Sequence, residues 1–594
     1  MSFTRVNSRP MPHAPASSPR EGSQKTTTVS RALADTLAQH CDHCFGLIGN
    51  ANSHFTSALT ESGFGYSSVR HESAAVGAAD AFHRAGGGLA IATATCGAGF
   101  TNALTTLAEA RVARIPLIFV VGTHPERPRP FDLNQAALLD ALDVCHRTVT
   151  PESALDDANF AVQHALSSRQ PVVLLLPYDL QEAQITTSAS ETQSANQEHL
   201  HTSRPEWLES TVTSLAEELQ AARRPLIIAG RGVLLSDTAE LVRRIGDSVG
   251  ALFMHSAMAR HVLSSPWQIG TVGGFAHTWQ VELARQADMV LFLGASFNAF
   301  QNRGGNMFAP DAKIIQVVDE PHPAAQPSVT PLLAKLEELL PVLAEQLEKP
   351  LESRAQTAKD SAMGETLGSS SSTWRAELKA LPTTAQVESL TCADGRLDPR
   401  ACLQYLNRIL PNERAVCTDG GHFLGWVPKY LDVPGPQQQV IVGTAIQSIG
   451  LGMGSLVGLA AARPEDYCVL VAGDGGGTMG IADLPAAIEQ LRRGRGGCVV
   501  FINDAAYGAE LHQFGDVGLD TSSMEIADYD FAAVGRAYGA HGFSVGKPED
   551  FAQLDAYFHD VSNSDEASVA VIDFKVSRLV VADFVKEVLA KAQR

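Results

Sequence analysis

Two short polar motifs, each directly after an apolar segment, constrain the fold of this chain more than any other feature. A Gly-Asp-Gly motif at residues 473–475 follows the apolar residues 470–472, and an Asn-Asp pair at residues 503–504 follows the apolar residues 499–502. Both apolar segments are typical of buried strands. A glycine-rich turn after a strand lets backbone N–H groups approach phosphate oxygens closely.

The aspartates of these motifs, Asp474 and Asp504, are candidate metal ligands at the ends of two strands. Their hard oxygen atoms suit Mg²⁺, which prefers octahedral oxygen coordination and is often shared with a diphosphate. We therefore predict a Mg²⁺-diphosphate site. If the register is shifted by one residue, Asn503 is the ligand instead of Asp504.

Length and charge limit the classes of protein to consider. At 594 residues the chain is too long for a single core, and we expect three domains. The formal net charge of −20 argues against nucleic acid and anionic membranes as partners. No apolar run approaches transmembrane length.

The nine cysteines are an odd number and lie mostly in apolar, strand-like segments. This favours reduced, buried thiols in a cytoplasmic protein. Cys41 and Cys44 have CxxC spacing, but no second pair completes a zinc site. We predict that they pack at the end of a helix.

Polar segments divide the chain. We predict a disordered N-terminal arm over residues 1–28 and linkers over residues 186–204 and 346–397. The domains between them would cover residues 29–185, 205–345 and 398–594.

Short apolar strands alternate with amphipathic helices in each domain. This pattern is typical of doubly wound parallel sheets, so we predict an α/β protein with three of them. The clearest predicted strands cover residues 89–93, 116–121, 171–176, 225–230, 289–294 and 313–318.

A catalytic acid is absent from the metal motifs, but the first domain offers one. Glu72 ends a predicted strand and precedes a helix of small residues over 73–81. A carboxylate at the carboxyl end of a strand lies where open α/β sheets bind ligands, and we expect apolar surroundings for it.

Five motifs in order resemble those of the acetolactate-synthase-like superfamily of thiamine-diphosphate enzymes. They are Phe-Gly-Leu-Ile-Gly at 45–49, His-Glu at 71–72, Thr-Cys-Gly-Ala-Gly-Phe-Thr-Asn at 95–102, Ser-Ile-Gly at 448–450 and the metal motifs. Ala98 replaces a proline of the family pattern. The resemblance covers nearly the whole chain after residue 28. It implies pyrimidine-binding, central and diphosphate-binding domains in that order.

The resemblance also implies cofactors, thiamine diphosphate and Mg²⁺, and roles for single residues. Glu72 would hydrogen-bond the ring nitrogen of the aminopyrimidine. Ile449 would be the bulky wedge that bends the cofactor, and the Gln447 carbonyl would receive the amino group. The cofactor would lie between two chains, so we expect at least a homodimer.

In the same way, Mg²⁺ would be held by the side chains of Asp474 and Asp504 and by the Ala506 carbonyl. Many relatives carry Asn at the position of Asp504. The remaining predicted cofactor-binding residues are Gly421, His422, Gly473, Gly475 and Gly476. His422 either binds a phosphate oxygen or lines the entrance.

Some relatives bind FAD in the central domain. Residues 230–232 and 294–298 form small-residue turns after strands, where a nucleotide could lie. The Phe-Asp-Asp-Arg pattern of FAD-binding synthases is replaced here by Phe-Asn-Ala-Phe at 297–300. FAD is therefore possible but not favoured.

Two reactions on a 2-oxo acid compete. Glu510, six positions after Asp504, resembles a glutamate of aldehyde-releasing decarboxylases, whereas Gln135 resembles the active-site glutamine region of synthases. Asn50 replaces a decarboxylase aspartate, which favours carboligation, the transfer of the acyl unit to a second carbonyl. Glu510 could instead be a solvated helix residue. A cofactor-free binding or regulatory protein is a third hypothesis, opposed by the intact acidic residues.

Overall fold

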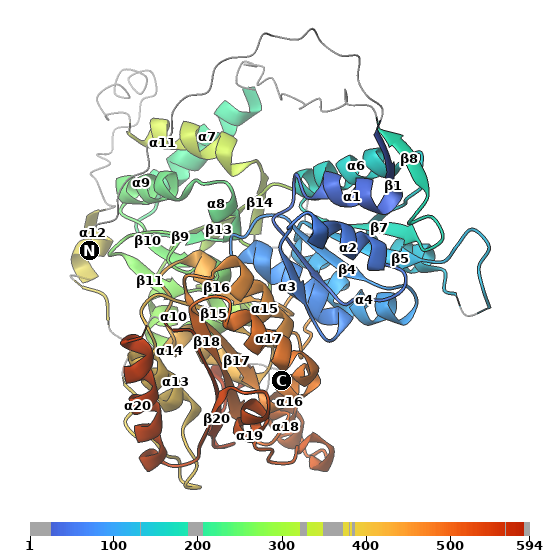
Figure 1. Cartoon of the computed structure of the whole chain (residues 1–594). Helices are drawn as coiled ribbons and strands as arrows, with labels where there is room; N and C mark the ends of the chain where they lie inside the picture. Colours follow the sequence, from blue (N-terminus) through green and yellow to red (C-terminus); the bar gives the residue numbers. More distant parts are fainter. Residues whose placement is uncertain are drawn as a thin grey trace, which may run out of the picture.

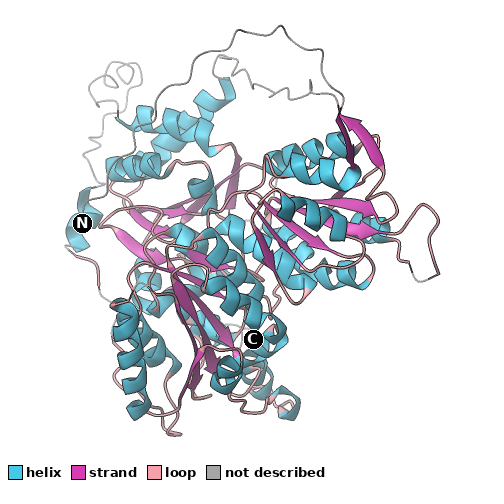
Figure 2. Cartoon of the chain, in the orientation of Figure 1, coloured by secondary structure: helices cyan, strands magenta, loops and turns pink. Residues whose placement is uncertain are grey.

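The computed structural model describes residues 25–130, 132–187, 206–320, 329–348, 372–378, 380–382, 386–564 and 566–586. They form three six-stranded parallel sheets, each packed between helices, and a separate two-stranded sheet. Figure 1 shows the amino-terminal (blue), central (green) and carboxy-terminal (orange) domains that contain them, and Figure 2 shows the helices around each sheet. The predicted fold class is confirmed.

The sheet of the amino-terminal domain has the order β3 (Tyr66–Ser68), β2 (His43–Gly46), β4 (Ala90–Ala94), β5 (Leu117–Thr123), β7 (Pro171–Pro177) and β6 (Cys145–Thr148). Its helices are α1 (Val29–Leu37), α2 (Ser53–Glu61), α3 (Glu72–Arg84), α4 (Ala98–Ala113), α5 (Gln135–Ala141) and α6 (Ala154–Ser168).

Two short strands, β1 (Lys25–Thr28) and β8 (Gln184–Thr187), pair antiparallel beside this domain. The prediction of a disordered arm over 1–28 is therefore wrong for its last four residues, because β-branched threonines favour an extended strand with a partner. Strand β8 also extends into the predicted linker 186–204. The rest of the arm lies outside the described residues.

The central sheet has the order β11 (Gln268–Thr271), β10 (Leu252–His255), β9 (Pro225–Ala229), β12 (Met289–Leu293), β13 (Lys313–Val318) and β14 (Val329–Leu333). Its helices are α7 (Glu206–Ala221), α8 (Arg231–Leu235), α9 (Ala239–Val249), α10 (Thr278–Ala284) and α11 (Leu336–Glu348). The predicted linker 346–397 contains the helix α12 (Ser372–Leu378), and much of the remainder lies outside the described residues.

The carboxy-terminal sheet has the order β16 (Gln439–Ile441), β15 (Arg414–Thr418), β17 (Tyr467–Gly473), β18 (Gly496–Asn503), β20 (Ser568–Lys575) and β19 (His541–Val545). Its helices are α13 (Pro399–Ile409), α14 (Val427–Tyr430), α15 (Gly452–Ala462), α16 (Asp474–Met479), α17 (Leu484–Leu491), α18 (Gly508–Gly515), α19 (Phe531–Ala537) and α20 (Phe551–Ser562).

The inner strands of the sheets were predictable because they are mostly apolar. Every residue of β5, β7 and β18 is buried, as expected for parallel strands with helices on both faces. Among the described residues, none of the helices combines the length and the apolar character that crossing a membrane requires.

The strand order locates the ligand-binding edge. Numbered within its own domain, each outer sheet has the order 2-1-3-4-6-5, and the central sheet has the order 3-2-1-4-5-6. Ligands of open parallel sheets bind at the carboxyl ends of strands where the order reverses. In the carboxy-terminal domain this point lies between β15 and β17, directly before Asp419 and Asp474.

Helices α3 and α15 join the two outer domains, and each follows the second strand of its sheet. A β-carbon built on Gly454 would lie 2.8 Å from the Ala74 Cα atom, and one on Gly458 would lie 2.0 Å from the Ala78 carbonyl oxygen. The two backbones are thus in direct contact, and this contact fixes one domain relative to the other.

We predict that Gly458→Ala lowers the free energy of unfolding by about 1–3 kcal/mol, because the added β-carbon overlaps the Ala78 carbonyl. Gly77→Ala is the matched control within α3, since its β-carbon would meet only the Thr106 methyl group at 3.4 Å. Alanine there should be neutral or stabilising. Denaturant unfolding of both variants measures the difference, and equal losses would contradict the packing argument.

Candidate functional site

The carboxyl ends of β17 and β18 bring Asp474 and Asp504, here called the aspartate pair, to the same edge of the sheet. The two strands are adjacent, with Gly473 opposite Ile502. Asp474 is 2% exposed and Asp504 is 9% exposed. Asp474 Oδ2 is buried without a hydrogen-bond partner. A buried carboxylate oxygen without a donor is costly, so this atom is poised to accept a cation.

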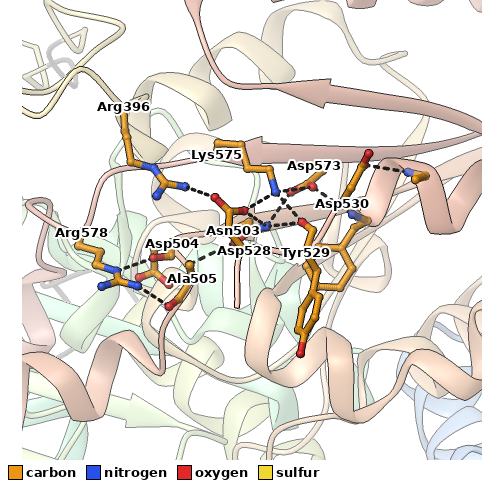
Figure 3. A network of polar contacts seen from close by, with 12 residues as sticks. Arg396, Asn503, Asp504, Ala505, Asp528, Tyr529, Asp530, Asp573, Lys575 and Arg578 are labelled. Carbon is orange, nitrogen blue, oxygen red and sulfur yellow. Dashed lines mark hydrogen bonds and ion pairs between the residues drawn. The ribbon is translucent and has the colours of Figure 1, made fainter. Parts of the chain in front are cut away.

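The side chain of Asn503 is engaged elsewhere (Figure 3). Its Nδ2 atom donates to Asp573 Oδ1 at 3.0 Å and to the Tyr529 carbonyl at 3.2 Å. These bonds tie the end of β18 to β20 and to the segment before α19. Asp504, rather than Asn503, is therefore the side chain that lies near Asp474.

Arg578 holds the turn that follows β18 (Figure 3). Its Nε atom donates to the Asp504 carbonyl at 2.7 Å, and an Nη atom donates to the Ala505 carbonyl. Ala505 has a φ of 57°, which is unfavourable for a residue with a β-carbon. The next backbone N–H, that of Ala506, lowers the pKa of both Asp474 and Asp504 and therefore lies near both carboxylates. The turn therefore links the ends of both strands.

Burial raises the pKa of Asp474 to about 7, and the neighbouring charge of Asp504 adds to this effect. Burial also raises the pKa of Asp504 to about 6, although the Arg578 guanidinium opposes the rise. Two close carboxylates disfavour each other's ionisation, and a divalent cation relieves this repulsion. Among the described residues, no group of three or more His, Cys, Asp or Glu side chains could hold a metal. A cation here would therefore also need backbone and ligand oxygens.

Glycines allow other residues to pack closely against the start of α16, directly after β17. A β-carbon on Gly475 would lie 2.7 Å from the Tyr507 ring, and one on Gly476 would lie 2.7 Å from Asp419 Oδ2. Gly473 precedes the helix, so the first free N–H groups of α16 lie at the strand end. This arrangement favours an anion. Gly476 also has to be a glycine because it lies directly against Asp419.

Asp419 connects this edge to the loop 443–450, which runs from β16 to α15. Its carboxylate accepts N–H bonds from Gly420 at 2.7 Å and from Gly450 at 2.9 Å. Burial raises the pKa of Asp419 to about 6, although these N–H groups oppose the rise. Gly421 has a φ of 136°, in a region that residues with side chains rarely adopt.

The loop 443–450 presents both residues predicted to contact the pyrimidine side of the cofactor. Gln447 is exposed and has a φ of 61°, and Ile449 is half-buried. Their roles remain predictions.

His422 borders the aspartate pair as a neutral ring. Its Nε2 atom accepts the Ala582 N–H at 2.9 Å, so its proton lies on Nδ1. Burial lowers the pKa of His422 to about 3. A β-carbon on Gly508 would lie 3.0 Å from His422 Nδ1 and 2.6 Å from Asp504 Oδ2. His422 and Asp504 therefore border the same space. Toward a ligand in this space, the Nδ1–H group of His422 can act only as a hydrogen-bond donor.

Helix α18 brings one further side chain, that of His512, near this space. The His512 ring lies 5.0 Å from the His422 ring, and His512 Nε2 is buried without a hydrogen-bond partner. Glu510 is exposed on the same helix. Glu510 is thus close to Asp504 in the sequence, and its side chain is accessible to solvent.

In the amino-terminal domain, Glu72 is the first residue of α3 and is half-buried. Its Oε2 atom accepts the Asn102 Nδ2 donor at 3.0 Å, so this neighbour from its own domain is polar rather than apolar as expected. Gln135 is 2% exposed and donates to the Gly122 carbonyl at 3.0 Å, at the end of β5. Gln135 is thus held inside the domain.

Three domain families match the chain in order. They are described as Thiamine pyrophosphate enzyme, N-terminal TPP binding domain (residues 27–147), central domain (residues 212–343) and C-terminal TPP binding domain (residues 419–574). The chain belongs to the thiamine pyrophosphate enzymes. The last match begins at Asp419 and includes the aspartate pair.

Similar proteins extend over most of the chain. The acetolactate synthase large subunit of Parasynechococcus marenigrum (strain WH8102) is 25% identical over 88% of this chain and 84% of that protein. A sulfoacetaldehyde acetyltransferase of Alcaligenes xylosoxydans xylosoxydans is 22% identical over 97% of both. The crystal structure of benzoylformate decarboxylase from Polynucleobacter necessarius has a TM-score of 0.73 and 18% identity, covering 93% of this chain and 99% of that chain. This last similarity shows the fold.

The site fits thiamine diphosphate, also called thiamine pyrophosphate, together with a divalent cation. The Asp474 Oδ2 atom is buried and unpartnered, and an oxygen of this kind could serve as a ligand for the cation. The first backbone N–H groups of α16 have no partner within the helix and could bind phosphate oxygens. His422 adds a neutral N–H donor.

The turns considered for FAD pack against each other. A β-carbon on Gly230 would lie 2.1 Å from the Gly294 carbonyl oxygen, and Arg231 between them donates to the Ala113 carbonyl of the amino-terminal domain at 2.7 Å. Packing explains these glycines, and no observation among the described residues supports FAD.

Two contributors to the site were missed from sequence. Arg578 acts through backbone carbonyls 74 and 73 residues earlier in the chain. Asp419 acts through the Gly450 N–H, 31 residues later. The position of Asp419 directly after a strand was a usable signal, whereas nothing in the local sequence marks Arg578.

The raised pKa of Asp474 predicts a pH dependence in metal-free protein. The folded chain holds this proton more tightly than the unfolded chain, where the ordinary value is 3.8. The resulting stability is complete below about pH 4 and is lost as the pH rises through about 7. Asp474→Asn imitates the protonated form. It should gain stability relative to the wild type by roughly 1–3 kcal/mol between about pH 5 and pH 8.

Denaturant unfolding in a chelating buffer measures this gain at each pH. Asp35→Asn, at an exposed position of α1, is the control and should show no trend. A difference for Asp474→Asn that is constant with pH would show that Asp474 is ionised throughout.

Proposed function

We propose that this enzyme uses thiamine diphosphate and Mg²⁺ to decarboxylate a 2-oxo acid and to transfer the resulting acyl anion equivalent to a second carbonyl compound. The observation that carries the use of the cofactor is the buried aspartate pair beside the start of α16. Carboligation is supported by relatives whose names are those of a synthase and an acetyltransferase. The identity of the oxo acid and of the acceptor is left to experiment.

Bound thiamine diphosphate supplies an acidic C2–H group and accepts the electron pair that is released with CO₂. The carboxylates of the aspartate pair and the Ala506 carbonyl would hold Mg²⁺ against the diphosphate. Backbone N–H groups at Gly473, Gly475, Gly476 and Gly421 and the Nδ1–H group of His422 would bind the remaining phosphate oxygens.

Glu72 would hold a proton at the ring nitrogen of the aminopyrimidine. Asn102 orients its carboxylate by donating to Oε2, which leaves Oε1 for the ring nitrogen. The Gln447 carbonyl would accept the amino group of the pyrimidine, and the Ile449 side chain would support the bent cofactor. Gln135, at the start of α5, would shape the acceptor side of the pocket next to the end of β5.

We further propose a homo-oligomer in which each site combines Glu72 of one chain with the aspartate pair of another. Glu72 is bonded by Asn102 of its own domain. To act as an acid it would need a cofactor next to it, and in this proposal a second chain holds that cofactor. All nine cysteines are free thiols, which suits the reducing cytoplasm.

A second candidate reaction is simple decarboxylation with release of an aldehyde. Glu510 favours it, because this side chain is exposed on α18, the helix that also carries His512. In this alternative Glu510 would deliver the proton that releases the aldehyde.

The products decide between the two reactions. We expect CO₂ from at least one acid in a panel of 2-oxo acids with Mg²⁺ and thiamine diphosphate, and carboligation products by mass spectrometry. Glu510→Gln should then retain the same products. Free aldehyde alone, lost in Glu510→Gln, would establish the decarboxylase. No CO₂ from any acid, without binding of thiamine diphosphate, would revive the cofactor-free hypothesis.

Two variants test the roles of the residues and the shared site. Glu72→Gln should retain thiamine diphosphate binding within about threefold but lose about 10²-fold or more in turnover. Asp474→Ala should lose the cofactor, as measured by calorimetry. Co-expression of the two variants should restore about one quarter of the wild-type activity, because half of the dimers carry one intact site. Mixtures without activity would contradict sites shared between chains.

A further inference from the structure

The loop 443–450 adopts a conformation that needs external support. Gly443 and Gly450 have φ values of 98° and 85°, and Gln447 between them has a φ of 61°. A residue with a side chain in this left-handed region costs on the order of 1 kcal/mol and persists only where its surroundings impose it. Residues 444–447 are exposed, so few of their own side chains can do so.

The support comes from Glu109, a residue of α4 in the amino-terminal domain. Its Oε1 atom accepts the N–H groups of Gly443 at 3.0 Å and Ala445 at 3.2 Å, and its Oε2 atom accepts that of Ile446 at 2.9 Å. The last of these N–H groups directly precedes Gln447. One carboxylate of another domain therefore fixes half of the loop.

Charge balance explains why the loop cannot leave this carboxylate easily. Glu109 is fully buried, and Arg84 Nη2 lies 3.6 Å from its Oε1 atom. The same guanidinium also binds the buried Asp80, with Nη2–Oδ2 at 3.2 Å. Two carboxylates thus share one cation, and the three loop N–H groups provide the additional compensation that the buried negative charge needs.

None of these three N–H groups belongs to a helix or a sheet. A contact that only stabilised the domain interface would not need a buried charge, since apolar side chains of similar volume usually do as well. The contact instead specifies the shape of one loop. At its other end, the Gly450 N–H is held by Asp419, so the loop is fixed by one carboxylate from each outer domain.

We propose that Glu109 is a positioning residue that holds Gln447 and Ile449 in register with the cofactor from across the domain interface. The effect on the cofactor rests on the proposed function of these two residues. The anchoring of the loop itself does not.

Glu109→Gln tests the anchor, because it keeps the size of the side chain but replaces one acceptor with an N–H₂ group. Glu109→Asp is the second variant. It retains the charge for Arg84 and withdraws the carboxylate from the loop by one methylene group. Ser67→Ala is the matched control, since it removes a different buried bond between the same domains, the 2.8 Å bond from Ser67 Oγ to Gln490.

The first measurement is hydrogen–deuterium exchange of the full-length protein without added cofactor. Both Glu109 variants should exchange the amides of residues 443–446 at least about tenfold faster than the wild type, with Ser67→Ala unchanged there. Equal exchange in folded Glu109 variants and wild type would overturn the anchor.

The second measurement is the rate at which the C2 proton of bound thiamine diphosphate exchanges with deuterium, followed by acid quench and NMR. The Glu109 variants should lower this rate about tenfold or more while the cofactor Kd changes less than about threefold. Fast exchange in the wild type and equal rates in the variants would overturn the positioning role alone. Absence of cofactor-bound exchange in the wild type would overturn the proposed function, and with it the role of Glu109 toward the cofactor.

Discussion

The direct backbone contact between α3 and α15 is the constraint on which the arrangement of the site depends. Both helices are built from small residues, so Gly454 and Gly458 can lie against Ala74 and Ala78. Each helix follows the second strand of its sheet, so the contact fixes the two outer sheets relative to each other. Glu72 at the start of α3 and Ile449 just before α15 are therefore placed by the same packing.

Buried acids concentrate at this junction. Asp474 and Asp504 face each other at the strand ends, Asp419 and Glu109 hold the loop 443–450, and Asp80 lies beside Arg84. Asp419 and Glu109 are satisfied mainly by backbone N–H groups, which provide donors without adding positive charge. The aspartate pair is different, because an oxygen of Asp474 has no donor. Within this group, the acids that bind backbone N–H groups thus differ from the aspartate pair, which has an oxygen atom without a partner.

Sequence was sufficient for the features that depend on local pattern. The strands were apparent because burial on both faces makes them continuously apolar, and the aspartate pair was apparent because it follows two of them. The choice between Asn503 and Asp504 needed the structure, since adjacent residues at a strand end can each turn toward the ligand. Glu109 could not be found from sequence, because its partner Gly443 lies 334 residues away.

The contact between α3 and α15 also has a consequence for how the protein is made. Helix α3 is synthesised with the first domain, whereas α15 follows only after the whole central domain. During that interval the small-residue face of α3 has no partner from its own chain. The first domain must therefore either fold with this face uncovered or wait for the third. Long-range contacts of this kind slow folding and expose apolar surface to other chains. The contact between α3 and α15 that fixes the two domains in the folded enzyme thus leaves apolar surface of the nascent chain open to aggregation until α15 has been made.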